Sequence, residues 1–288
     1  MPELPEVETV CRGLLPIVGH EIVRCDVRRR DVIRDRTADT SNPRRGKIEH
    51  DSLGIGSRVV ELIRLGKQMA MIVEDAKQRE HVIVIQLGMS GQVSLIDTPK
   101  IPNAKHVHVV WSLEDGRRVC FRDARRFGGV TLIVDRTHLN NFWSTLGPDA
   151  LGITPPQLRD GLGQSSRMIK AALLDQGVLA GVGNIYADEA LYLAGIDPRT
   201  LCDQLDSDDV RRLAQAIRRV LRAAVDARGS TLRDYRDANN EAGEAQLGHR
   251  VYNRSGLPCL GCSTVLESTR IAQRSTCWCP LCQPPKQV

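Results

Sequence analysis

Short runs in which apolar and polar residues alternate dominate the chain between residues 22 and 133. Seven such runs are separated by turn-forming residues, and regular short strands of this kind are typical of a β-sandwich or barrel. We expect strands at 59–63, 69–73, 81–86, 92–96, 106–111, 118–122 and 129–134. The polar segment 35–46 is predicted as a loop, because it carries several arginines and an Asn-Pro pair.

Helical spacing occurs on both sides of this region. An N-terminal helix that ends at Gly19 would have an apolar face made of Val7, Val10, Cys11, Leu14 and Leu15. From residue 148 onward the periodicity is helical, so we place the boundary between domains at 135–155. The clearest helix there begins with Asp206 or Ser207 as its cap. Its apolar face consists of Val210, Leu213, Ile217, Val220, Leu221 and Ala224.

Composition narrows the function only slightly. With 288 residues, 41% of them hydrophobic and 26% charged, the chain has the composition of a soluble protein with room for two domains. The net charge of +5 favours an anionic partner weakly, but residues 245–288 hold five basic residues against one acidic residue, which suits phosphate groups. No apolar run approaches the roughly 18 residues of a membrane span, and no signal-peptide pattern is present. We therefore expect a cytoplasmic protein without a membrane partner.

Five of the nine cysteines lie near the C-terminus, and four of these form two Cys-x-x-Cys pairs. Sixteen residues separate Cys259 and Cys262 from Cys279 and Cys282. This spacing predicts four thiolates arranged tetrahedrally around one structural zinc ion. Because sulfur would fill all four positions, the metal would organise the fold and take no part in the chemistry. Cys277 has the wrong spacing for a ligand.

The first eight residues carry a candidate for covalent chemistry. Removal of the initiator methionine would expose the secondary amine of Pro2 beside the carboxylates of Glu3 and Glu6. An α-amino group has a pKa of about 8, against about 10.4 for lysine, so more of it is neutral and nucleophilic at pH 7. Its attack on a sugar aldehyde carbon forms a cationic iminium that promotes elimination, which indicates a lyase. The alternative is that Pro2 and Pro5 only open the first helix.

Two short helices in the second half are joined by a turn that contains Gly181 and Gly183. We expect Asn184 to cap the second helix, and the glycines would let a phosphate approach backbone N–H groups at its N-terminus. An ordinary helical hairpin explains the pattern equally well.

Two turns between predicted strands carry side chains suited to an opened base pair. Met89 lies in one turn, and Arg125, Arg126 and Phe127 lie in the other. A protein that extrudes a base needs an apolar wedge and a hydrogen-bonding arginine to fill the gap. Taken singly, Met89 fits a core position, the arginines fit a solvated surface, and Lys67 is an ordinary surface lysine after a glycine.

Together these residues resemble the formamidopyrimidine-DNA glycosylase (Fpg/MutM) family, base-excision enzymes that share a fold with endonuclease VIII. The motifs, in the family's order, are the Pro-Glu start, Arg64-x-Gly-Lys67, Leu87-Gly-Met-Ser-Gly91, Lys105-His106-Val-His108, Arg125-Arg-Phe-Gly128, Gly181 to Leu191, and Arg274 with the cysteine pairs. The resemblance implies a multi-domain α+β fold. Its parts would be a catalytic β-sandwich edged by the N-terminal helix at 1–140, a helix–two-turn–helix DNA-binding domain at 148–240, and a zinc-finger β-hairpin at 248–284.

The resemblance also implies a role for each matching residue. Pro2 is similar to the Schiff-base nucleophile, Glu3 to the acid that protonates the sugar ring oxygen, and Glu6 to a supporting carboxylate. Lys67 matches the lysine that assists β-elimination and contacts the lesion's phosphate, and Arg274 matches the arginine credited with δ-elimination. The implied DNA contacts are the wedge of Met89, Arg125 and Phe127, the neighbouring His106 and Arg126, and the phosphate-gripping Lys170 and Asn184.

The implied function is that of a bifunctional DNA glycosylase and abasic-site lyase of base excision repair. It would remove 8-oxoguanine and formamidopyrimidines from double-stranded DNA, and it would act as a nucleoid-associated monomer in the bacterial cytosol. Three positions depart from the family pattern: Gln86 replaces a histidine, Ser165 replaces a basic residue, and 243–246 lacks an aromatic pair before glutamine. That last segment belongs to a loop associated with covering the flipped base. Two alternatives therefore stay open: an endonuclease VIII-like enzyme for oxidised pyrimidines, and a catalytically silent protein that binds damaged DNA.

Overall fold

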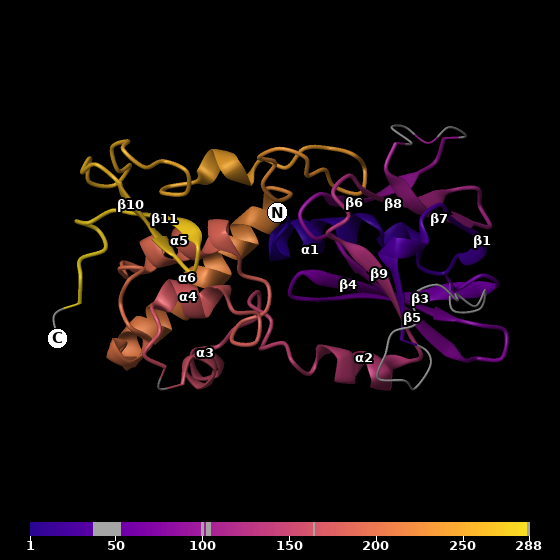
Figure 1. Cartoon of the computed structure of the whole chain (residues 1–288), viewed down its shortest axis with the longest axis horizontal. Helices are drawn as coiled ribbons and strands as arrows, with labels where there is room; N and C mark the ends of the chain where they lie inside the picture. Colours follow the sequence, from indigo (N-terminus) through magenta and orange to yellow (C-terminus); the bar gives the residue numbers. More distant parts are fainter. Residues whose placement is uncertain (37–52, 99–100, 102–104, 164, 287–288) are drawn as a thin grey trace. The chain divides into compact units, whose positions relative to one another are not determined.

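The computed structural model describes residues 1–36, 53–98, 101, 105–163 and 165–286 (Figure 1). The chain forms two compact units. The first combines Met1–Ser144 with Arg228–Gly243, and the second combines Thr145–Ala227 with Glu244–Val288. All but the first two residues of the loop expected at 35–46 lie outside the described residues.

This division differs from the three predicted domains in two places. Residues 228–243 pack with the N-terminal unit, because Glu6 accepts a hydrogen bond from the backbone N–H of Ser230. The zinc-finger segment packs with the helices, because the buried carboxylate of Glu189 accepts three hydrogen bonds from the backbone N–H groups of 250–252. Both contacts join residues that are distant in sequence, so no local pattern could indicate them.

In the described part of the first unit, nine strands form one sheet, in the order β2-β9-β5-β4-β3-β1-β7-β8-β6. Among these strands only the β2–β9 pair is parallel, and β1 meets β3 through just two residue pairs, which makes this junction the corner between two layers of a sandwich. The strands are β1 (Glu21–Val27), β2 (Ile33–Asp35), β3 (Ser57–Leu65), β4 (Gln68–Glu74), β5 (Glu80–Gln86), β6 (Gly91–Ile96), β7 (Val107–Leu113), β8 (Arg118–Asp123) and β9 (Gly129–Ile133).

All seven predicted runs form strands, with ends within two residues of the prediction. The prediction missed β1 and β2. In β1 only Ile22 is buried, so the chain there lacks the alternation that marks a half-buried strand. The three residues of β2 are too few to show a period.

The core of this unit lies between the two layers. It contains Ile83 and Ile85 from one layer and Val109, Trp111 and Phe121 from the other, all essentially inaccessible to solvent. The indole N–H of Trp111 donates to the carbonyl of residue 53 at 3.2 Å, so the buried polar atom is satisfied. Burial of this apolar area is the main force that holds the sandwich together.

The helix α1 (Leu4–Gly13) covers this core with Val7 and Val10. It was expected to continue to Gly19, but it ends earlier and is followed by the 3₁₀ turn η1 (Leu15–Ile17). Pro16 has no N–H for the helical hydrogen bond, and its ring clashes with the carbonyl four residues before it. Leu15 is consequently exposed and does not belong to the buried face.

Helices and a small hairpin build the second unit, after α2 (Arg136–Trp143) closes the first. As predicted, α6 begins after its cap Asp206, whose side chain accepts from the N–H of Asp209 at 2.8 Å. Within the described part of the chain, no helix is both long and apolar enough to cross a bilayer. The elements are α3 (Pro155–Leu162), α4 (Ile169–Leu174), α5 (Asn184–Ala194), η4 (Cys202–Gln204), α6 (Ser207–Asp226), η5 (Ala245–Gly248), β10 (Glu267–Ile271) and β11 (Arg274–Trp278).

Candidate active site and metal centre

The N-terminal residues are held by a buried carboxylate. Glu6 lies in the first turn of α1, where its Oε2 accepts a hydrogen bond from the N–H of Glu3 at 2.7 Å. Its Oε1 accepts from the N–H of Ser230, also at 2.7 Å. Pro2, Glu3 and Glu6 are all buried. One side chain therefore fixes the backbone next to Pro2 and attaches the 228–243 segment to it.

The approach of that segment requires a glycine. Gly229 has a φ of +79°, and a Cβ atom at this position would lie 2.9 Å from Oε1 of Glu6. The hydroxyl of Tyr235 donates to the carbonyl of Glu6 at 3.3 Å, and burial raises the pKa of this phenol. Ser230 and Tyr235 were missed from the sequence, although the Gly-Ser-Thr run marked the start of the segment.

The turn that carries Lys67 is attached to the same helix. Gly66 and Lys67 link β3 to β4, and Gly66 takes the positive φ of 57° that this turn needs. The Arg64 Nε atom lies 2.7 Å from Oε2 of Glu8, and its Nη1 donates to the Gly66 carbonyl at 3.1 Å. Partial burial alone would raise the pKa of Glu8, but hydrogen bonds from Arg64 and Arg12 lower it below its usual value. Arg64 and Glu8 thus hold the Lys67 turn against α1.

Asp123 organises the two turns that carry the predicted wedge. This carboxylate is fully buried and accepts from Ser90 Oγ at 2.5 Å, from the N–H of Arg125 at 3.2 Å and from the N–H of Gly128 at 2.7 Å. The Nε2 atom of His108 donates to the Asp123 carbonyl at 2.7 Å. The sequence offered no signal for this role, because the partners of Asp123 come from three separate segments.

The wedge residues meet because the two turns pack backbone against backbone. A Cβ on Gly88 would lie 2.5 Å from the backbone nitrogen of Gly128, so neither turn tolerates a larger residue there. Met89 and Phe127 are 38% and 60% exposed, and Arg125 donates to the Met89 carbonyl at 3.3 Å. An exposed methionine and phenylalanine beside an arginine form a surface suited to contact with a ligand.

His106 and Arg126 lie near these turns, and both have a positive φ, of 65° and 58°. The guanidinium of Arg126 is 3.0 Å from a carboxylate oxygen of Asp31. Desolvation, together with the charges of Lys105 and Arg122, lowers the pKa of His106. A neutral imidazole at pH 7 favours hydrogen bonding over a charge contact.

In the second unit, the structure contradicts the prediction that Lys170 grips a phosphate. Its side chain is 0% exposed, and Nζ lies 2.7 Å from Oδ1 of Asp188. The same Nζ donates to the Ser275 carbonyl at 2.9 Å and to Thr276 Oγ1 at 2.8 Å. The ammonium group is therefore fully occupied inside the protein. Burial raises the pKa of Asp188 to about 6, although its pairing with Lys170 opposes that shift.

Asn184 also has a different local role from the one expected. It is the first residue of α5, and Gly183 occupies the cap position, so Asn184 does not cap the helix. Its Nδ2 donates to the Ser275 carbonyl at 3.0 Å, which makes that carbonyl an acceptor for both Asn184 and Lys170. Ser275 follows Arg274, which is exposed where β11 begins. The two predicted phosphate ligands thus hold the hairpin that presents Arg274.

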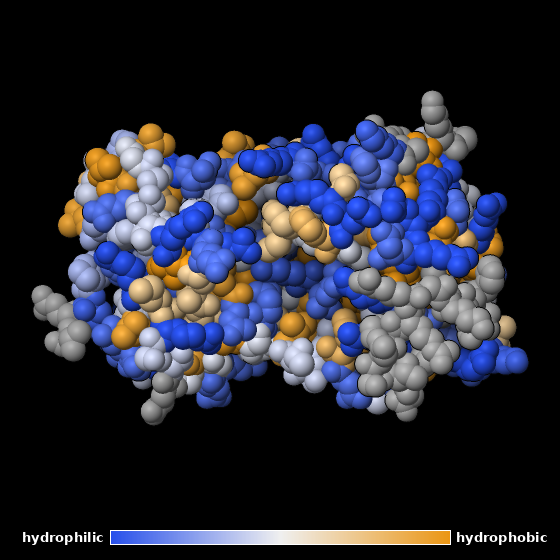
Figure 2. Space-filling view, in the orientation of Figure 1, coloured by the Kyte–Doolittle hydropathy of each residue, from blue (hydrophilic) through white to orange (hydrophobic). Residues whose placement is uncertain are grey.

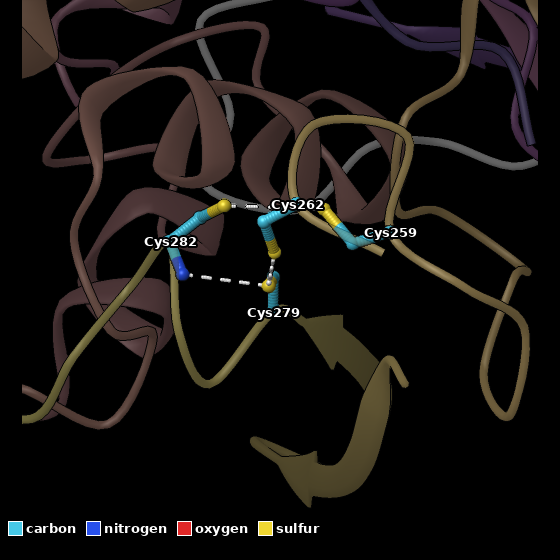
Figure 3. A group of neighbouring side chains, drawn as sticks. All are labelled: Cys259, Cys262, Cys279 and Cys282. Atoms are coloured by element: carbon cyan, nitrogen blue, oxygen red, sulfur yellow. Dashed lines mark hydrogen bonds between the residues drawn. The ribbon is translucent and has the colours of Figure 1, made fainter. Parts of the chain in front are cut away.

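Four sulfur atoms converge beside this hairpin (Figure 3). The Sγ atoms of Cys259, Cys262, Cys279 and Cys282 all lie within 4.8 Å of one another, and two of the pairs are separated by 3.9 Å and 3.4 Å. A tetrahedral zinc site with Zn–S bonds of about 2.3 Å separates its sulfurs by about 3.8 Å, so the cluster fits zinc. Cys277 is outside the cluster, and burial raises the pKa of its thiol to about 11.

Segments of both units match known protein families. The formamidopyrimidine-DNA glycosylase N-terminal domain matches 1–130, the H2TH domain of the same enzyme matches 146–236, and the zinc finger found in FPG and IleRS matches 256–285. The formamidopyrimidine-DNA glycosylase of Herpetosiphon aurantiacus is 39% identical, over 98% of this chain and all of that protein. This chain belongs to the formamidopyrimidine-DNA glycosylase family.

Solved structures of the family show the same fold. The MutM (Fpg) protein of Thermus thermophilus is similar with a TM-score of 0.80 and 37% identity, over 99% of this chain and all of that one. A mutant of the Lactococcus lactis Fpg, crystallised with DNA that contains Fapy-dG, has a TM-score of 0.83 and 31% identity, over 98% of this chain and all of that one. As a family member the chain is a DNA glycosylase of base excision repair, and the predicted α+β fold and the zinc finger are confirmed.

Proposed function

We propose that this chain removes oxidised purines from double-stranded DNA and then cleaves the abasic site through a Schiff base on Pro2. The Lactococcus relative binds DNA that contains a ring-opened purine, which supports purine lesions as the substrate class. The exposed Met89, Arg125 and Phe127 suit the gap that an extruded purine leaves, because extrusion costs a few kcal/mol that inserted side chains must offset.

In the proposed reaction, the Pro2 nitrogen bonds to the sugar carbon C1′ while the bond from C1′ to the damaged base breaks, and the departing base takes up the proton that the Pro2 nitrogen loses. Glu3 gives a proton to the ring oxygen as the C1′–O4′ bond opens, and this leaves an iminium at C1′. Solvent water then takes a proton from C2′ and the bond from C3′ to the 3′ phosphate oxygen breaks, with Lys67 near the charge of the departing phosphate. A second elimination expels the 5′ phosphate with the help of Arg274, and water releases the sugar fragment from Pro2.

One observation carries this proposal above the others. Glu6 binds the backbone N–H groups of Glu3 and Ser230, both at 2.7 Å and both buried. This arrangement holds the backbone beside Pro2 rigidly, as a nucleophile that must meet C1′ in one orientation requires. A helix start alone explains the bond from Glu3, which belongs to a capping box at the beginning of α1. It does not explain the bond from Ser230, which joins α1 to a segment more than two hundred residues away.

Borohydride trapping on abasic-site DNA tests the nucleophile. The processed protein should form a covalent adduct, and a variant with one extra residue before Pro2 should form none, because its amine becomes an amide. A matched control replaces the exposed Pro16 with alanine and should trap as well as the wild type. Undiminished trapping by the extended protein would refute the assignment, and trapping by neither form would favour the silent DNA-binding alternative.

Lesion choice is tested separately with duplexes that each carry one damaged base. We expect faster excision of 8-oxoguanine and formamidopyrimidines than of thymine glycol. The opposite order would favour the endonuclease VIII-like alternative, which is suggested by the absence of an aromatic pair at 243–246.

We further propose that the protein acts as a monomer, since a single lesion requires one active site. We place it beside the nucleoid in the bacterial cytosol, where its DNA substrate lies.

A further inference from the structure

A polar pocket of about 440 Å³ opens on the first unit, on the side of β6 and β8. The visible face over these strands is mostly hydrophilic (Figure 2). Three of the six lining residues are arginines, two are amides and one is an aspartate. They are Gln92, Arg122, Arg233, Asp234, Arg236 and Asn240. With three positive charges and one negative charge, the lining carries a formal charge of +2.

Part of the pocket is pre-organised. Arg122 extends from β8, where its Nη1 donates to Gln92 Oε1 at 3.1 Å and its Nε donates to the Lys105 carbonyl at 3.1 Å. Gln92 in turn donates to the backbone carbonyl of Asp234, which attaches the 228–243 segment to β6. Arg122 is therefore held in place before any ligand arrives, and this lowers the entropic cost of binding.

The other two arginines lack a counter-charge. No carboxylate in the described part of the chain pairs with Arg233 or Arg236. Asp234 is 57% exposed and lies 3.8 Å from Arg125, outside hydrogen-bonding distance. Asp237 is buried and accepts from the N–H groups of two residues in its own turn, at 3.0 and 2.8 Å. The guanidinium groups of Arg233 and Arg236 are exposed or half-exposed and have no acidic partner in the described part of the chain, and they lie beside the anchored guanidinium of Arg122. This arrangement favours the binding of an anionic ligand.

We propose that Arg122, Arg233 and Arg236 bind a phosphate group, and that this phosphate belongs to the DNA backbone. The planar guanidinium fork binds phosphate oxygens through paired hydrogen bonds, and three forks around one pocket suit a group with several acceptor oxygens. Asp234 places the pocket beside Arg125 of the wedge, so a strand that contacts the wedge would pass close to it. This inference rests on the proposed function, because it assigns a further DNA contact to the same protein.

Salt-dependent binding to undamaged duplex tests the site. Arg236→Gln should weaken binding about tenfold at 0.15 M salt and reduce the slope of log Kd against log salt by about one, as the loss of one phosphate contact does. Arg236→Lys keeps the charge but loses the fork, so it should retain the slope and lose less affinity. The matched control is Arg24→Gln, which removes an exposed arginine from β1 outside the pocket and should change neither quantity.

The outcomes separate this site from the proposed catalytic function. Arg236→Gln should still form the borohydride adduct at saturating protein concentration, because Pro2 is untouched. If the wild type itself formed no adduct, the proposed catalysis would be rejected, and the salt dependence of DNA binding would still test the pocket. An affinity and slope equal to those of Arg24→Gln would overturn the proposal. Binding of ATP that Arg236→Gln abolishes while duplex binding stays unchanged would also overturn it, since the phosphate would then come from a free nucleotide.

Discussion

Replacement of Lys170 by methionine should be among the most damaging single changes in the second unit. The ammonium group and Asp188 form an ion pair of 2.7 Å with side chains 0% and 2% exposed. Methionine has a similar length but leaves the carboxylate buried without its cation, and removal of one partner of a buried pair costs about 3–5 kcal/mol. It also removes one of the two donors to the Ser275 carbonyl and the donor to Thr276 Oγ1.

The loss of unfolding free energy in Lys170→Met should depend on pH in a defined direction. Burial already raises the pKa of Asp188 to about 6, and Lys170 is the main group that lowers it, so methionine should raise this pKa further. A carboxyl whose pKa is higher in the folded state stabilises the fold at pH values below its unfolded pKa, near 3.9, and that stability is lost as pH rises through the folded pKa. The difference in unfolding free energy between wild type and Lys170→Met should therefore grow above pH 6, by up to about 1.4 kcal/mol per pH unit.

Urea unfolding of the zinc-loaded protein at pH 6 and pH 8 measures this deficit, with zinc release to a chromogenic chelator as the signal from the second unit. A second variant, Lys170→Met/Asp188→Asn, removes the charge but keeps an oxygen acceptor for the N–H of Cys277, so it should recover most of the stability and lose the pH dependence. Because the pair holds the residue after Arg274, Lys170→Met should also lower the ratio of δ- to β-elimination products. A deficit below about 1 kcal/mol that is equal at both pH values would refute the reasoning.

Three further changes test other parts of the structure. Gly229→Ala should reduce borohydride trapping and cost about 2 kcal/mol, since its φ of +79° and a Cβ 2.9 Å from Glu6 both oppose a side chain; normal trapping and stability would show that the segment adapts. Cys262→Ser should lose zinc, whereas Cys277→Ser should keep one ion per chain by atomic absorption, and equal zinc contents would contradict the ligand assignment. Ala272→Gly should raise the temperature of zinc release by about 2 °C, because glycine accepts the φ of 48° in the hairpin turn, and a lower temperature would argue against strain there.

Much of the fold could be predicted from short-range patterns. Alternation located the strands from β3 to β9, since a strand with one face in a core must place apolar residues at every second position. The aspartate before α6 marked a helix start because a cap needs only its own next three residues. The cysteine spacing predicted the zinc site for the same reason, because each pair of ligands sits on one tight turn.

The candidate site could be predicted in part only. Local motifs indicated Pro2, Met89, Arg125 and Phe127. The family resemblance implied that Lys170 grips a phosphate, which would require an exposed side chain. Its burial depends on Asp188 and on the hairpin more than one hundred residues away, and no pattern around residue 170 contains that information.

The sequence by itself determined which segments form strands and helices, where four thiolates can meet, and which family the motifs resemble, because each of these depends on residues close together in the chain. Only the tertiary structure decided that Glu6 joins Glu3 to Ser230, that Asp123 organises the wedge, and that the three arginines of the phosphate pocket face one space. The physical reason is that the burial and the hydrogen-bond partners of a polar group are set by the surfaces that pack around it, and those surfaces come from distant parts of the chain.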